Sequence, residues 1–137
     1  MEFDPSAFIA DPALVEALEK RAMPVPCDTD RVLFRQGDPP VGVYIVHKGK
    51  ATLSMTSEEG KPLMSVETTD GALLGLPGLI GNQPYSLTAV ACSGAQVNFI
   101  SRDQFTALME SDPTLSLKIL QVLAAEVRTA RYALTHR

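Results

Sequence analysis

Six short apolar runs separated by turn residues fill the middle of the chain, between residues 31 and 100. Glycine, proline and aspartate lie in the gaps, and such residues end a strand within a few positions. Strands of this length and spacing favour an antiparallel barrel or sandwich, and closing a barrel removes exposed strand edges. The runs cover residues 32–34, 43–46, 51–55, 63–67, 87–91 and 96–100.

Helical patterns flank this β region on both sides. The first thirty residues are predicted to be helical, because the Asp-Pro pairs at 4–5 and 11–12 each supply an N-cap acceptor followed by a proline at the first helical position. Ser101 with Gln104 three residues later forms a capping box, which predicts a new helix after the last strand.

A third Asp-Pro pair, at 112–113, begins a final helix that no glycine or proline interrupts before Arg137. At 1.5 Å per residue a helix of about 24 residues is ~36 Å long, more than one small barrel can cover. Apolar residues spaced 3, 4, 3 and 4 apart form the seam of a two-helix coiled coil and predict a homodimer. The seam is Leu120, Leu123, Val127, Ala130 and Leu134, and a second stripe of Leu115, Ile119 and Val122 is predicted to face the chain's own barrel. The alternative is one broad stripe packed within the monomer.

Length and charge exclude several classes of protein. The chain has 137 residues, which suits a single domain, and its net charge is −4, which argues against nucleic acid bound by this chain itself. No apolar run approaches the ~18 residues that a membrane span needs. The acidic N-terminus lacks the basic and apolar regions of a signal peptide, so a cytoplasmic location is expected.

Residues suited to catalysis or metal binding are few and scattered. Cys27 and Cys92 lie 65 positions apart, and His47 and His136 have no acidic partner at a ligand spacing. We therefore predict no metal site and no enzyme. Both cysteines are expected to be small apolar fillers, reduced and not bridged.

Three motifs occur in a specific order: Val-Leu-Phe-Arg-Gln-Gly-Asp at 32–38, Val-Tyr-Ile-Val-His-Lys-Gly at 43–49 and Asp-Gly-Ala-Leu-Leu-Gly at 70–75. Together they resemble the cyclic nucleotide-binding domain of the catabolite activator protein superfamily over about the whole chain. The resemblance implies one domain over residues 1–137, mainly β with flanking helices. It would comprise N-terminal helices at 1–30, a double-stranded β-helix (jelly-roll) barrel at 31–100, and C-terminal helices at 101–137 that end in a long dimerisation helix.

The same resemblance identifies a phosphate-binding cassette at residues 75–89. It assigns ligand binding to Gly75, Leu76, Gly78, Leu79, Tyr85, Ser86 and Leu87. In the family a glutamate holds the ribose and an arginine holds the phosphate, but here Leu76 and Tyr85 occupy those positions. Pro77 also removes one backbone N–H from the cradle. Affinity for cAMP or cGMP is therefore predicted to be far below that usual for the family.

Two functions are compatible with these features. The first is a non-enzymatic ligand-sensing domain that binds a cyclic nucleotide or another small ligand. The second is a structural or protein-interaction module that kept the fold after losing its ligand. An enzyme of the related cupin class is disfavoured, because His47 is the only histidine in the barrel region. The family's helix-turn-helix domain has no counterpart here, so the chain is either a stand-alone sensor or the sensor fragment of a transcription regulator.

Overall fold

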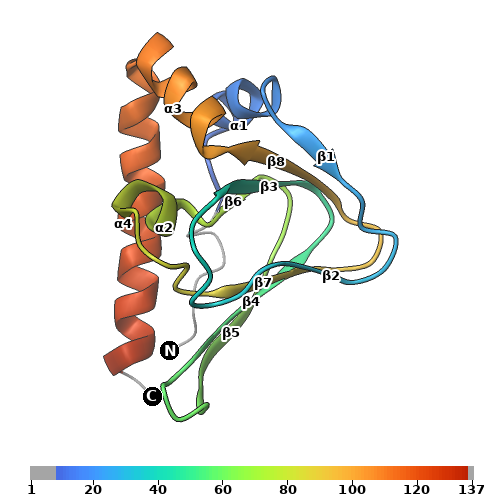
Figure 1. Ribbon diagram of the computed structural model, residues 1–137, viewed down its shortest axis with the longest axis vertical. Coiled ribbons are helices and arrows are strands. Elements are labelled where there is room, and N and C mark those ends of the chain that lie inside the picture. The colour runs from blue at the N-terminus through green and yellow to red at the C-terminus, as the bar shows by residue number, and fades with distance from the viewer. Residues whose placement is uncertain (1–8, 136–137) are drawn as a thin grey trace.

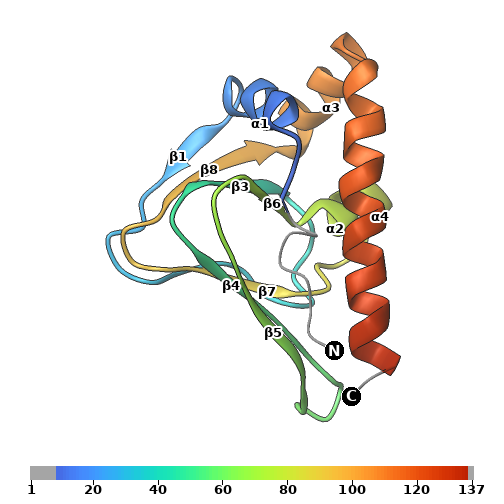
Figure 2. The ribbon, with the colours of Figure 1, turned by 180° about the vertical axis from the view of Figure 1, so that it is seen from behind.

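Two four-stranded antiparallel sheets face each other, and the helices lie against the first of them (Figures 1 and 2). The computed structural model describes residues 9–135, with side chains as far as residue 124. The first sheet has the strand order β1-β8-β3-β6 and the second β2-β7-β4-β5. The strands are β1 (Met23–Val25), β2 (Arg31–Phe34), β3 (Gly42–Lys48), β4 (Ala51–Thr56), β5 (Pro62–Thr68), β6 (Ala72–Leu74), β7 (Thr88–Ala91) and β8 (Gln96–Ser101). The predicted mainly β fold with flanking helices is confirmed.

Local capping signals place the helices. The Asp11 carboxylate accepts the Ala13 N–H at 2.8 Å and so begins α1, and the Ser101 hydroxyl accepts the Gln104 N–H at 3.3 Å and begins α3. Both predicted starts are confirmed. The helices are α1 (Pro12–Glu19), α2 (Leu76–Gly81), α3 (Arg102–Ser111) and α4 (Thr114–Thr135).

Two apolar clusters hold these layers together. One fills the space between the sheets, and the other joins the first sheet to the helices. Strand β3 serves both, because successive side chains of a strand point to opposite faces: Val43 and Ile45 belong to the helix-facing cluster, and Val46 to the inter-sheet cluster. The predicted inner stripe of α4 is buried in the helix-facing cluster through Leu115, Ile119 and Val122.

The helical prediction for the first thirty residues is wrong beyond Glu19. Residues 23–25 instead form β1, which pairs antiparallel with β8. Pro24 and Pro26 explain the difference, because proline cannot continue a helix but is tolerated in an edge strand. The predicted helix start at residues 4–5 lies outside the described residues.

The sheets do not close into one hydrogen-bonded barrel in the described part of the chain. Strands β1 and β6 form the edges of the first sheet, and β2 and β5 those of the second. Ile9 bridges to Ala72, and the Ala10 N–H donates to the Gly71 carbonyl at 3.0 Å, so the N-terminal segment covers the β6 edge. Edges are thus protected locally, by an added segment or a proline, and the two sheets form a sandwich, one of the two predicted arrangements.

Asp11 also ties α1 to α4, because Lys118 Nζ lies 3.1 Å from its second carboxylate oxygen. The hydrogen bond from Lys118 is the main reason why the pKa of Asp11 is lowered. A lowered pKa stabilises the fold above the ordinary aspartate pKa, and this stabilisation is lost as the pH falls through the lowered value. The pair is partly exposed, so the effect is small.

We therefore expect Asp11→Asn, which keeps a capping oxygen but loses the ion pair, to lower the Tm by a few degrees at most at neutral pH. The difference from wild type should vanish in acid, when Asp11 is protonated. Thermal unfolding followed by circular dichroism at both pH values is the measurement. Glu58→Gln, at an exposed position in the β4–β5 hairpin, is the control. Equal Tm values for Asp11→Asn and wild type at neutral pH would contradict the prediction.

Candidate functional site

The predicted cassette forms a turn, a short helix and a returning loop. Strand β6 leads through Gly75 into α2, and the chain returns to β7 by way of Tyr85. Gly75 has a φ of 92°, and a Cβ atom there would lie 2.9 Å from a ring carbon of Tyr85. Both the backbone angle and the contact require glycine. The cassette is thus built around the Tyr85 side chain.

Tyr85 is buried and fully hydrogen-bonded. Its side chain is 2% exposed, and its ring stacks on Phe34 with the ring centroids 4.1 Å apart. Its hydroxyl donates to the Gly42 carbonyl at 2.8 Å and accepts the N–H groups of Val41 at 3.0 Å and Gly42 at 3.2 Å. One donor and two acceptor sites are all that a phenol hydroxyl has. The Tyr85 hydroxyl therefore has no remaining hydrogen-bonding capacity for a ligand.

The Tyr85 backbone is held as firmly as its side chain. Its N–H donates to the Asp38 carbonyl at 3.0 Å, and its carbonyl accepts the Gly37 N–H at 2.8 Å. These bonds join the cassette loop to the turn of the first sequence motif. The sequence pattern did not identify Val41 or Gly42 as partners of the cassette. Position 42 requires glycine for a separate reason, because a Cβ atom there would lie 2.3 Å from the Ile100 carbonyl oxygen.

The structure divides the other predicted ligand-binding residues between different environments. Leu76 and Leu79 are buried in the helix-facing cluster, whereas Leu87 packs half-buried on the inter-sheet cluster with Tyr85. Gly78 lies against Tyr85, because a Cβ there would be 3.3 Å from the ring. Ser86 is exposed. Gly75 and Gly78 are therefore brought together on Tyr85, and Leu76 and Ser86 are not.

Arg35 and Arg102 are the arginines nearest to the cassette in the sequence. The Arg102 guanidinium donates to the Pro40 carbonyl at 2.8 Å, and Arg35 is exposed. Pro77, in the first turn of α2, has no backbone N–H to offer an anion.

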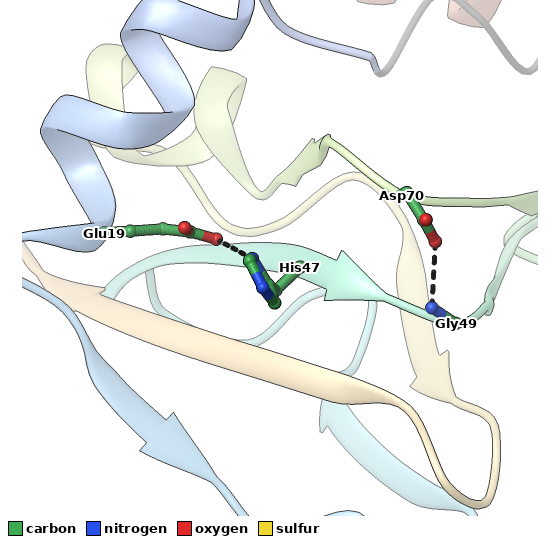
Figure 3. Close-up of polar contacts among 4 residues, drawn as sticks. All are labelled: Glu19, His47, Gly49 and Asp70. Atoms are coloured by element: carbon green, nitrogen blue, oxygen red, sulfur yellow. Dashed lines mark hydrogen bonds and ion pairs between the residues drawn. The ribbon is translucent and has the colours of Figure 1, made fainter.

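His47 and Asp70, from two of the motifs, join parts of the fold (Figure 3). His47 Nδ1 lies 2.9 Å from a Glu19 carboxylate oxygen, which connects β3 to the end of α1. The Asp70 carboxylate accepts the Gly49 N–H at 2.9 Å. Among the described residues no group of three His, Cys, Asp or Glu side chains is arranged to hold a metal ion. Within the same part of the chain, no helix is long and apolar enough to cross a membrane.

Both cysteines are free thiols with different exposure: Cys27 is buried and Cys92 is half-buried. Burial is the main reason why the pKa of Cys27 is raised, which reduces its reactive thiolate fraction.

We expect iodoacetamide to modify Cys92 several times faster than Cys27 in the folded protein, and both at similar rates in denaturant. Mass spectrometry of timed digests measures both rates. Equal native rates, or a mass loss of two hydrogen atoms with no label uptake, would contradict the prediction.

The comparisons with known proteins agree with this geometry. The sequence pattern of the family described as cyclic nucleotide-binding domain matches residues 24–112. The CRP-like cAMP-activated global transcriptional regulator of Mycobacterium tuberculosis is 22% identical over 118 residues, which are 86% of this chain and 53% of the regulator. Acetyltransferase Pat of Mycolicibacterium smegmatis is 26% identical over 98 residues, which are 72% of this chain and 29% of that enzyme. The chain thus spans about half the length, or less, of these curated relatives.

The fold is also that of a solved structure. The crystal structure of the Thermus thermophilus catabolite activator protein superposes with a TM-score of 0.76 at 23% identity, over 96% of this chain and 62% of that one. Since the family pattern matches well over half of the sequence, at residues 24–112, the chain belongs to the cyclic nucleotide-binding domain family.

Proposed function

We propose that this chain is a non-catalytic regulatory domain that transmits its signal through α4 and whose cassette does not bind cAMP or cGMP. The regulatory role is supported by membership of the family and by similarity to a CRP-like transcriptional regulator. The loss of cyclic nucleotide binding is supported by one observation, the buried and fully hydrogen-bonded Tyr85.

The energetic argument concerns the phosphate charge. An anion taken out of water must be matched by donors, and a guanidinium is the group best shaped for phosphate. Hydrogen bonds to a charged group contribute about 1.5–3 kcal/mol each. Losing the contacts of the arginine and of the ribose-binding glutamate together should therefore weaken binding by about two to four powers of ten. The Tyr85 ring adds to this, because it already occupies the space beside Gly75 and Gly78.

Helix α2 is placed to connect the cassette to α4. It packs on β3 on one side and on α4 on the other, and Leu79 of α2 and Ile119 of α4 share the helix-facing cluster. A change in the position of α2 would therefore alter the packing of α4. A ligand can drive such a change only through different affinities for the two arrangements. In a longer protein, α4 would pass the change to the next domain, as expected for the sensor portion of a cytoplasmic transcription regulator.

A structural or protein-interaction module that has lost its ligand is the second candidate. The complete hydrogen bonding of Tyr85 favours it, because the Tyr85 hydroxyl needs no ligand to satisfy its donor and acceptor sites. The two candidates differ in whether any small molecule binds and alters α4.

Isothermal titration with cAMP and cGMP tests the proposal, and we expect no heat of binding at low-micromolar concentrations. The Mycobacterium tuberculosis regulator, titrated in the same way, is the control. Low-micromolar affinity for either nucleotide would refute the proposal. The double change Leu76→Glu with Tyr85→Arg would introduce the family's two charged residues, but the new carboxylate would lie in the apolar helix-facing cluster. We expect this variant to be destabilised and not to gain affinity.

A further inference from the structure

A concave site lies away from the cassette, where residues of the edge strands β1 and β2 line one cleft. It is a half-open cleft of about 300 Å³, lined by residues of β1, β2, β3 and β8. In Figure 1, β1 and β2 lie at the same end of the molecule, on opposite sheets. Ligand pockets span roughly 300–1,000 Å³, so the cleft suits a molecule of one or two rings.

Aromatic rings form the inner wall of this cleft. Tyr44 and Phe99 lie with ring centroids 4.9 Å apart, and Met23, which is 70% exposed, lies at the mouth. The row of rings continues inward, because Phe34 lies 5.9 Å from Tyr44 and 4.1 Å from Tyr85. A planar aromatic ligand against Tyr44 and Phe99 would therefore contact the row that ends in the cassette.

Two polar groups lie among these apolar walls. Arg31 uses one guanidinium nitrogen to donate to the Pro26 carbonyl at 3.2 Å, and no carboxylate among the described residues forms an ion pair with it. Asp30, its neighbour, is engaged by the Ser93 N–H at 2.7 Å. Arg31 therefore has donors to offer an anion.

The Tyr44 hydroxyl is the second polar group. Burial is the main reason why the pKa of Tyr44 is raised, so the hydroxyl is protonated and able to donate at neutral pH. Arg31 and Tyr44 both line the cleft. Two hydrogen-bond donors thus line the same cleft as the aromatic wall, a combination that suits an aromatic acid.

We propose that the cleft between β1 and β2 binds a planar aromatic carboxylate of one or two rings, with Arg31 and Tyr44 on the carboxylate and Phe99 against the ring. The site is separate from the cassette, and its occupation does not depend on what the cassette binds. It supplies a ligand class for a domain whose cassette lacks the family's ionic contacts.

The test is a titration of the isotope-labelled full chain with 2-naphthoate, followed by ¹H–¹⁵N NMR. We expect shift changes centred on β1 and on residues 31–33, 44 and 99. The neutral 2-naphthamide and the non-aromatic cyclohexanecarboxylate should bind at least about tenfold more weakly, because each loses one of the two recognition elements. Equal affinity for naphthamide, no shift changes at millimolar naphthoate, or changes centred elsewhere would overturn the proposal.

Variants locate the site independently. Arg31→Gln is expected to weaken naphthoate binding about 10- to 100-fold, and Tyr44→Phe, which keeps the ring, less than that. Arg35→Gln is the matched control, because Arg35 is an exposed arginine just after β2 that does not line the cleft. Arg31 is itself exposed, so its replacement should leave the fold intact. Loss of affinity in Arg35→Gln equal to that in Arg31→Gln would overturn the proposal, whatever the result with cyclic nucleotides.

Discussion

Tyr85→Ala is expected to destabilise the domain by about 3–5 kcal/mol, the range found when a buried aromatic side chain is truncated to alanine. This is a large fraction of a small domain's total stability of roughly 5–15 kcal/mol. Removal of the ring would leave a cavity between Phe34 and the two cassette glycines, Gly75 and Gly78. The N–H groups of Val41 and Gly42 also lose the acceptor that they share. Urea unfolding at neutral pH, followed by circular dichroism, measures the change.

Two further variants separate packing from hydrogen bonding. Tyr85→Phe keeps the ring but leaves the Val41 and Gly42 N–H groups without the hydroxyl, so a loss of about 1–3 kcal/mol is expected. Ser86→Ala is the matched control, because Ser86 is the exposed neighbour and its change should stay within about 0.5 kcal/mol. If Tyr85→Ala unfolds at the same urea concentration as Ser86→Ala, Tyr85 is not the core of the cassette. The proposal that the cassette does not bind cAMP or cGMP then loses its main support.

Local signals in the sequence predicted the parts of the fold that local chemistry determines. The helix caps at Asp11 and Ser101 could be predicted because a capping contact spans only two or three residues. Six of the seven strands between residues 31 and 101 coincide with the predicted apolar runs, whereas β6 (Ala72–Leu74) was not among those runs. The strand at 23–25 was missed, because three residues carry too little periodicity to distinguish a strand from the end of a helix.

The cassette shows where prediction from sequence stops. Its position and its glycines could be read from the motifs, and the resemblance led us to expect Leu76 and Tyr85 where the family has charged residues. Whether Tyr85 lines an open pocket or fills it depends on residues 41 and 42, more than 40 positions away in the chain. The burial of Leu76 in the helix-facing cluster likewise depends on how α2 packs against α4. Contacts of this range are set by the whole fold.

The outer face of α4 carries the second prediction with a large expected effect. Leu120 is 56% exposed, while Leu115, Ile119 and Val122 of the same helix are buried. Leu120 begins the predicted coiled-coil seam, in which Leu123 is half-buried and Val127, Ala130 and Leu134 have side chains outside the described residues. Leu117, 69% exposed, flanks the seam and extends the apolar surface beyond what the spacing predicted. We propose that a second copy of the chain covers this face in a parallel two-fold dimer.

Leu120→Glu is therefore expected to raise the dimer Kd by about two to four powers of ten. Burying a leucine contributes about 1.5–3 kcal/mol, and a two-fold axis doubles the loss. The two new carboxylates would also meet near the axis without a partner. Gln121→Glu adds the same charge on the adjacent exposed position, off the seam, and should leave the Kd nearly unchanged. Sedimentation velocity across a concentration series distinguishes these results, and a wild type that is monomeric at micromolar concentration would refute the dimer.

The direction of the two helices can be tested in the same system. In a parallel two-fold dimer each seam residue faces its own counterpart, at a separation that a disulfide can bridge. Leu120→Cys, introduced together with Cys27→Ala and Cys92→Ala, should therefore form a cross-linked dimer on mild oxidation. Gln121→Cys in the same background should not, because position 121 points away from the axis. In an antiparallel pair the two copies of residue 120 would lie far apart, because residue 120 is near the start of a 22-residue helix. Neither cysteine variant would then cross-link, although sedimentation would still report a dimer.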